Sequence, residues 1–384
     1  MGEIADVLTA IGSLHQRGEQ MALATVVAAR GSTYRRPGAR LLIPETGDLV
    51  GNISGGCVDG DVVEVAKVVM VGGKPRLASF DLTSDDEAVW GYGLGCNGAI
   101  EVFVEPADKA AEVAGALQAA LDEERPLGVA LVLESDVDGV ERGSRMLVHP
   151  DGRTEGTLGS PLADDVAKAE VLDALEAGKS ATRKVPVGDG EIRAFFEVLE
   201  PSPRLLVCGA GHDAIPFVRI AAEMGWKVLV VDDREQFLNA ERFPEAAGFV
   251  LVGRPLEAAE KTGADKRTYV ALMSHNYLRD LDYLKSYLGT DVAYVASLGP
   301  RPRLERLLAD LAKEGIYPPQ SDLDKIFGPA GVDIGGEGPE EVALAMVAEI
   351  MAVRHRRNAG FLRDRKGPIH ERENPETAAS VTAG

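Results

Sequence analysis

A glycine-rich turn in the second half of the chain constrains the fold more than any other feature. The apolar run 205–208 leads into Gly209-Ala210-Gly211, and Ala214 completes the spacing G-x-G-x-x-A before a helical pattern begins. In this spacing the first glycine allows a tight turn, the second lets the backbone approach a phosphate, and a small third residue permits close packing of helix on strand. The pattern predicts a Rossmann-type unit whose helix N-terminus offers amides and a positive dipole end to an anion.

Two further features point to a nucleotide ligand. The next apolar run, 227–231, ends in Asp232, at the distance where an acidic residue binds a ribose hydroxyl. His275 follows the apolar run 268–273, at the carboxyl end of a predicted strand, where ligands of open α/β sheets bind. The candidate nucleotide-binding residues are therefore Gly209, Gly211, His212, Asp232 and His275. The alternative for the two histidines is an exposed position or a position beside a helix cap, without a role in binding. The alternative for the whole unit is a Rossmann fold that has lost its ligand.

The order of predicted helices and strands changes at residues 200–203. This segment contains two prolines, which cannot both lie in a central strand. Helices and short strands mix before this point, which predicts an N-terminal α+β domain over residues 1–200. After it, near-continuous apolar strands alternate with helices, as in a parallel sheet covered on both faces. We therefore expect an α/β protein with a doubly wound, Rossmann-type sheet over residues 203–384, ending in a frayed C-terminal tail.

Charge and hydropathy exclude several classes of partner. The 384 residues carry a formal net charge of −20, a field that repels nucleic acid and anionic lipid. The longest apolar runs, such as residues 21–29, are far shorter than the ~20 residues that span a bilayer. Residues 1–6 lack the pattern of a secretory signal, and the three cysteines form no CxxC pair. These features predict a cytoplasmic protein without nucleic-acid or membrane partners.

A basic loop stands out in this acidic chain. Residues 30–40 contain four arginines, Arg30, Arg35, Arg36 and Arg40, together with Ser32, Thr33 and two glycines. The planar guanidinium suits recognition of phosphate or carboxylate, so we expect the loop to bind an anion, with Ser32 and the glycines adding donors. A solvated turn between two strands is the alternative.

The segment Ser54-Gly55-Gly56-Cys57 places a thiol where a glycine loop enters a helix predicted from about residue 58. The helix dipole favours the thiolate, the form that binds soft metals or attacks electrophiles, whereas Asp59 and Asp61 oppose it. We expect Gly55 and Gly56 to present main-chain amides to a bound phosphate and Cys57 to contact a cofactor. A cysteine tolerated at a small-residue position is the alternative.

The other two cysteines differ in their surroundings. Cys96 follows a run with three glycines, residues 91–95, and is a second candidate for cofactor contact. Cys208 lies inside the strand before the Rossmann turn, and we expect it to be a small buried hydrophobe.

At these loops the sequence resembles the XdhC/CoxI family, accessory proteins of xanthine dehydrogenase, carbon monoxide dehydrogenase and related molybdenum hydroxylases. The resemblance covers nearly the whole chain. Its motifs are residues 31–40, 54–57 and 90–96 in the first domain and residues 209–213, 274–280, 298–301, 331–337 and 367–370 in the second. The basic loop departs from the common family sequence Gly-Ser-Ser-Pro-Arg, because Thr33-Tyr34 replace Ser-Pro, and the usual Gly-Gly-Gly-Cys begins with Ser54.

The resemblance implies a protein that binds the molybdenum cofactor, aids its sulfuration and delivers it to an apo-hydroxylase. Cys57 would then contact molybdenum through the bound cofactor, because a thiolate is a soft ligand, and the arginines would hold the pterin phosphate. The Rossmann turn would hold a nucleotide, either that of a dinucleotide form of molybdopterin or a separate NAD(P). The implied partner is a molybdenum hydroxylase of the xanthine or carbon monoxide dehydrogenase type, and a cysteine desulfurase is a candidate second partner.

Two other functions remain open from the residues alone. The Gly209 turn, Asp232 and His275 also fit an NAD(P)-dependent oxidoreductase, although no acid–base pair beside a substrate pocket is evident. The other hypothesis is a scaffold that docks a hydroxylase. We expect a homodimer. One side of the helix predicted over residues 339–353 is apolar, which indicates either burial against its own domain or a dimer contact.

Overall fold

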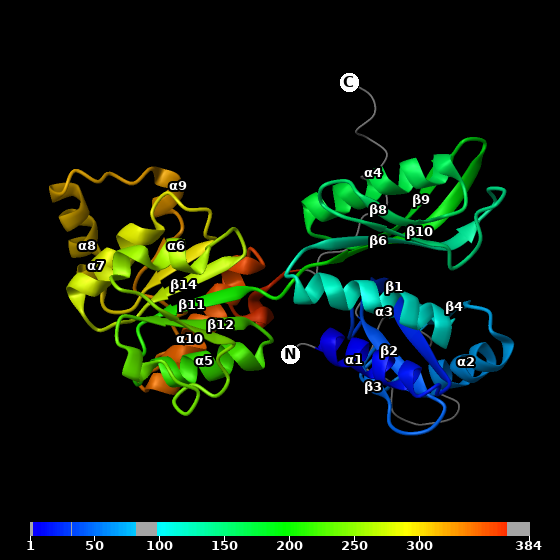
Figure 1. The fold of residues 1–384 in the computed structure, drawn as a ribbon, viewed down its shortest axis with the longest axis horizontal. Helices are drawn as coiled ribbons and strands as arrows, with labels where there is room; N and C mark the ends of the chain where they lie inside the picture. The colour runs from blue at the N-terminus through cyan, green and yellow to red at the C-terminus, as the bar shows by residue number, and fades with distance from the viewer. Residues whose placement is uncertain (1–2, 32, 82–97, 367–384) are drawn as a thin grey trace. The chain divides into compact units, whose positions relative to one another are not determined.

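The computed structural model describes residues 3–31, 33–81 and 98–366, so Ser32, Cys96 and the motifs at 90–96 and 367–370 lie outside the described residues. The chain divides into two compact units (Figure 1), a first unit that ends at Pro201 and a second unit from Ser202 to Asp364.

Among its described residues the first unit contains two antiparallel sheets of five strands. One has the order β3-β2-β1-β5-β4 and consists of β1 (Met21–Gly31), β2 (Arg40–Pro44), β3 (Val50–Gly51), β4 (Arg76–Asp81) and β5 (Gly98–Pro106). The other has the order β8-β7-β6-β10-β9 and consists of β6 (Leu127–Ser135), β7 (Arg145–Val148), β8 (Thr154–Thr157), β9 (Ala181–Val187) and β10 (Gly190–Leu199). They are covered by the helices α1 (Glu3–Gln16), α2 (Asp59–Gly72), α3 (Ala107–Asp122) and α4 (Pro161–Ala177).

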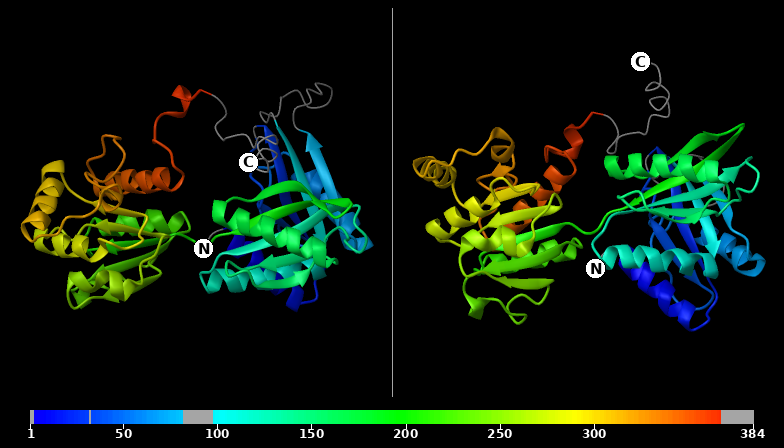
Figure 2. Two further views of the ribbon diagram at one scale, coloured as in Figure 1. Left: turned by 90° about the horizontal axis from the view of Figure 1, so that it is seen from above. Right: turned by 45° about the horizontal axis from the view of Figure 1, so that its top comes forward.

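Alternation along β1 explains how these layers are held together. Successive residues of a strand point to opposite faces, so Ala22, Ala24 and Val26 pack against α2, whereas Leu23 packs with α1 and α3. Helix α4 covers the second sheet, as the two views in Figure 2 show. The loop that enters α2 therefore lies on the α2 side of the first sheet, and it carries Cys57.

The second unit is built on six parallel strands in the order β13-β12-β11-β14-β15-β16. The strands are β11 (Arg204–Cys208), β12 (Lys227–Asp232), β13 (Gly248–Leu251), β14 (Thr268–Leu272), β15 (Tyr294–Ser297) and β16 (Ile326–Phe327). Counted along the unit this order is 3-2-1-4-5-6, that of the Rossmann fold, with its topological switch point between β11 and β14. The predicted fold class is confirmed.

Helices cover both faces of this sheet (Figure 1). Leu205 and Val207 of β11 pack with α5 (Ala214–Glu223) and α10 (Pro339–Arg354), and Leu206 and Cys208 pack on the opposite face. That face is covered by α6 (Ala258–Thr262), α7 (Tyr277–Tyr287) and α8 (Arg301–Lys313), while the short helices are α9 (Gln320–Leu323), η1 (Glu235–Phe237), η2 (Pro255–Glu257) and η3 (Leu362–Asp364). None of the described helices has the length and apolar character needed to cross a bilayer.

Apolar residues of β11 and α10 lie in the core of the second unit. Cys208 is fully buried, as expected for a small hydrophobe, and burial raises the pKa of its thiol. Met346 and Ile350 on the apolar side of α10 are also fully buried, in the same cluster as Phe217 of α5. The apolar side of this helix is therefore core of its own unit.

Candidate functional site

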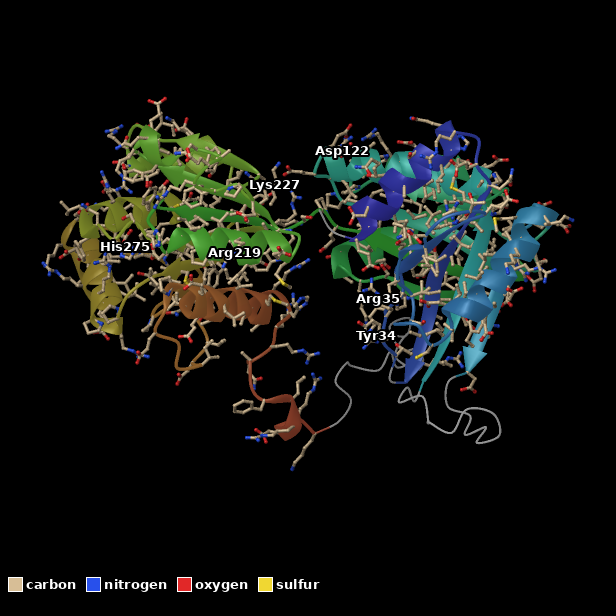
Figure 3. All side chains as sticks on the ribbon, turned by 90° about the horizontal axis from the view of Figure 1, so that it is seen from below. Tyr34, Arg35, Asp122, Arg219, Lys227 and His275 are labelled. Atoms are coloured by element: carbon tan, nitrogen blue, oxygen red, sulfur yellow. The ribbon has the colours of Figure 1, made fainter. Side chains whose placement is uncertain are left out.

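The basic loop connects β1 to β2, and its arginines lie in different surroundings. Arg30 and Arg36 are exposed. Arg35 is half-buried, and its Nη2 donates to Oε2 of Glu3 in α1 at 2.5 Å. Figure 3 labels Tyr34 and Arg35 within this loop. Arg30 and Arg36 are thus the guanidinium groups best placed to meet an anion from solvent.

Arg40 requires a correction. Its side chain is only 5% exposed, and its Nη2 donates to Oε2 of Glu197 in β10 at 2.6 Å. A second buried pair, Arg145 with Glu105, likewise joins the two sheets at 3.0 Å. The predicted anion-binding role of Arg40 is therefore wrong for this structure, because its guanidinium is already neutralised inside the unit. The first residue of β2 points inward, which the spacing of arginines in the loop did not reveal.

The cysteine loop is closed by side chains that bond its own amides. Oδ1 of Asn52 accepts from the amides of Ser54 at 3.1 Å and Gly55 at 2.9 Å. Oγ of Ser54 accepts from the amides of Gly56 and Val58, both at 3.2 Å. The expectation that Gly55 and Gly56 present amides to a phosphate is therefore corrected, since those amides are engaged by Asn52 and Ser54. The loop instead fixes the position of Cys57.

Tyr34 brings the basic loop against the cysteine loop. A Cβ built on Gly55, whose φ is +72°, would lie 3.2–3.3 Å from three carbons of the Tyr34 ring. The tyrosine remains 69% exposed, so the rest of its ring faces solvent. Cys57, half-buried two residues before α2 begins, comes from the same loop as Gly55. We call Tyr34, Arg36 and Cys57 the thiol surface.

The sequence reasoning did not select Tyr34. The only signal is that Thr33-Tyr34 stand where the family commonly has Ser-Pro, a replacement that by itself indicates no more than lower rigidity. A thiol, an exposed aromatic ring and a guanidinium are the groups that contact a soft metal, a flat heterocycle and a phosphate, respectively. These residue types make the thiol surface the candidate binding site of the first unit.

The first glycine of the Rossmann turn lies in close contact with the neighbouring backbone. Gly209 has a φ of +121°, and a Cβ there would lie 2.6 Å from backbone atoms of Ser274. This close approach joins the turn after β11 to the end of β14, the two strands that flank the switch point. His212 is exposed in the turn.

Asp232 lies at the end of β12 and is 2% exposed. Its Oδ2 accepts from the amide of Ala210 at 2.7 Å, and Arg234 bonds both of its carboxylate oxygens at 2.8–2.9 Å. A ribose hydroxyl would have to compete with Arg234 for this carboxylate. The structure thus gives Asp232 a role in holding the glycine turn, which the sequence did not predict.

Ionisation of Asp232 gives the second unit a predictable pH dependence. Burial opposes the charged form, but hydrogen bonds from Arg234 and from two backbone amides outweigh it, so the pKa lies below its usual value. A lowered pKa contributes stability above the unfolded value, about pH 3.9, that is lost as pH falls through the folded pKa. We expect Asp232→Asn to reduce the free energy of unfolding by about 1–3 kcal/mol at pH 7. Urea unfolding should show this difference shrinking below about pH 4; a difference that persists there would contradict the assignment.

His275 lies at the same edge of the sheet as the turn, and the structure pairs it with a residue that sequence reasoning missed. Its Nε2 lies 2.7 Å from Oδ2 of Asp213, the residue that precedes α5. Figure 3 labels His275 in the second unit. Nearby, Arg279 of α7 bonds Asp233 at 3.0 Å, and Arg242 donates to the carbonyl of Ala210 at 3.2 Å. The turn is therefore bordered by arginines from several segments.

Both units match models of one protein family. The model described as the XdhC and CoxI family matches residues 14–81 and 120–186, and the model described as the XdhC Rossmann domain matches residues 205–350. The chain belongs to the XdhC and CoxI family. The first model covers Cys57 and the basic loop, and the second covers the glycine turn and His275.

Known relatives extend over most of the chain. A Bacillus subtilis (strain 168) protein, named as a probable subunit of xanthine dehydrogenase, is 28% identical over 91% of this chain and 97% of its own length. The Escherichia coli (strain K12) protein named "Uncharacterized protein YqeB" is 26% identical over 62% of this chain and 45% of its own length. A crystal structure titled as a xanthine dehydrogenase from Bacillus halodurans superposes with a TM-score of 0.73 at 26% identity, covering 94% of this chain and 98% of that one.

Proposed function

We propose that this protein is an accessory protein of a xanthine dehydrogenase-type molybdenum hydroxylase. In this role it binds the molybdenum cofactor at the thiol surface and supports its maturation and insertion into the apo-enzyme. The observation that carries the proposal is the contact of Tyr34 with Gly55, which brings the exposed arginine loop against the loop of Cys57. Family membership and the names of the relatives support the same partner.

Cys57 and the exposed arginines of the basic loop have distinct parts in the proposal. The Cys57 thiolate would contact the molybdenum of the bound cofactor, because a thiolate is a soft ligand. Arg36, and Arg30 at the end of β1, would hold the pterin phosphate in place of the buried Arg40. The cofactor itself supplies the metal and its dithiolene. A carbon monoxide dehydrogenase is the alternative recipient, and a cysteine desulfurase would be the sulfur donor.

We further propose that the second unit binds a nucleotide at the turn of Gly209 and Gly211. The Rossmann strand order, and the position of the turn directly before the N-terminus of α5, support a phosphate at this position, because a helix N-terminus favours an anion. The nucleotide is either part of a dinucleotide form of the cofactor or a separate NAD(P). Mass spectrometry of ligands released from freshly purified protein would distinguish the two.

Cofactor retention tests the role of Cys57. We expect the wild-type protein, purified from cells with intact molybdenum-cofactor synthesis, to carry a pterin that is measured by fluorescence after oxidation. Cys57→Ser keeps the fold but replaces the soft ligand, so we expect at least about tenfold less pterin, the equivalent of about 1.4 kcal/mol. Cys208→Ala, which removes the buried thiol of the second unit, is the matched control and should retain pterin. Equal pterin in wild type and Cys57→Ser would remove the thiol from the proposal.

A further inference from the structure

The Rossmann turn has a carboxylate in front of the glycine that a ligand would approach. A Cβ built on Gly211 would lie 2.7 Å from Oδ1 of Asp213 and 3.4 Å from Cδ2 of His275. The second glycine of this fingerprint is the position whose bare backbone approaches a phosphate. The side chains of Asp213 and His275 therefore lie against the side of Gly211 that a Cβ would occupy.

Asp213 behaves here as an internal anion. It is the N-cap residue of α5, yet its side chain makes no capping hydrogen bond and instead bonds Nε2 of His275 at 2.7 Å. Its other oxygen, Oδ1, is buried with no hydrogen-bond partner among the described residues. A carboxylate at a helix N-terminus interacts favourably with the dipole, as a phosphate does. Asp213 thus takes the electrostatic place of the ligand's phosphate.

His275 is held in position by the residues on either side of it. Its φ of +56° lies in the left-handed region, which is unfavourable for a residue with a side chain. Before it, Oγ of Ser274 donates to Oδ1 of Asp280 at 2.5 Å, and after it Asn276 caps α7 by accepting from two amides. These contacts fix the backbone that places the imidazole beside Gly211, while 60% of the side chain stays exposed.

We infer that Asp213 is a built-in competitor for the diphosphate of a nucleotide. A nucleoside diphosphate group enters the turn by displacing the Asp213 carboxylate from His275, and the imidazole then donates to the phosphate. Asp213 therefore sets the affinity of the site, and a nucleoside without phosphates leaves the Asp213–His275 pair closed. The inference rests on the proposed nucleotide binding by the second unit and adds the residue that regulates it.

Calorimetry with ADP-ribose on the full chain tests this inference. Asp213→Asn removes the competing charge and supplies an amide donor, so we expect its affinity to rise about tenfold. His275→Asn should bind more weakly than wild type, because asparagine tolerates the left-handed backbone but lacks the imidazole. Asp291→Asn is the matched control, an exposed acid before β15 at the opposite edge of the sheet, and its affinity should equal that of wild type.

The outcomes separate this inference from the other proposals. Affinity in Asp213→Asn that is equal to or below that of wild type would overturn the competitor role, as would an equal gain in Asp291→Asn. Absence of ADP-ribose binding in all four proteins would overturn both this inference and the nucleotide proposal. Pterin retention at the thiol surface is measured independently, so none of these outcomes bears on the proposed cofactor binding by the first unit.

Discussion

Replacing Gly209 with alanine will destabilise the second unit by about 3 kcal/mol or more. The φ of +121° is a conformation that alanine rarely adopts, and the new Cβ would lie 2.6 Å from the backbone nitrogen and Cα of Ser274. Because the clash is with main chain, no change of rotamer relieves it. The turn after β11 and the end of β14 would have to move apart, which opens the packing at the switch point.

Gly211→Ala, two residues further along the same turn, is the control. Its Cβ would meet Oδ1 of Asp213 at 2.7 Å, but that atom is the end of a side chain that can rotate away. We therefore expect a loss of stability within about 1 kcal/mol. Unfolding in urea can be followed by the fluorescence of Trp226, which is buried against Tyr269 in this unit. A Gly209→Ala protein as stable as Gly211→Ala would show that the backbone contact is absent.

The Rossmann unit could be predicted from sequence because its turn imposes local demands on residue type. Only glycine fits the backbone at position 209, and the small Ala214, buried with α5, follows at fixed spacing. The near-continuous apolar strands, which alternate with helices along the chain, then predicted a parallel sheet with helices on both of its faces. Each of these constraints acts within a few residues or within one βαβ unit, so the pattern can be recognised from the sequence alone.

The side-chain partners could not be predicted because they come from distant positions. Asp213 meets His275 across 62 residues, and Arg40 meets Glu197 across 157 residues and between two sheets. The sequence shows that a charged side chain is present, but it does not show which residue of opposite charge pairs with it in the fold. For the same reason the glycines of the cysteine loop were expected to bind phosphate, although Asn52 and Ser54 already take their amides.

The ion pair between Arg40 and Glu197 yields the second large effect that we expect. Both side chains are nearly excluded from water, at 5% and 8% exposure, and their atoms lie 2.6 Å apart. Removing one charge leaves the other buried without compensation, which typically costs about 3–5 kcal/mol. Glu197→Gln should therefore lower the free energy of unfolding of the first unit by about 3 kcal/mol, with little dependence on salt, because buried pairs are weakly screened.

Glu64→Gln provides the same chemical change at the surface, where Glu64 pairs with Lys67 at 71% and 59% exposure. Exposed pairs contribute about 0–1 kcal/mol, so this variant should unfold close to wild type. The double variant Arg40→Met, Glu197→Leu replaces both charges with apolar groups and should recover most of the loss, because an apolar pair needs no compensating charge. If Glu197→Gln and Glu64→Gln unfold at the same urea concentration, the pair is hydrated in solution, and Arg40 returns to the set of arginines that are available to bind an anion.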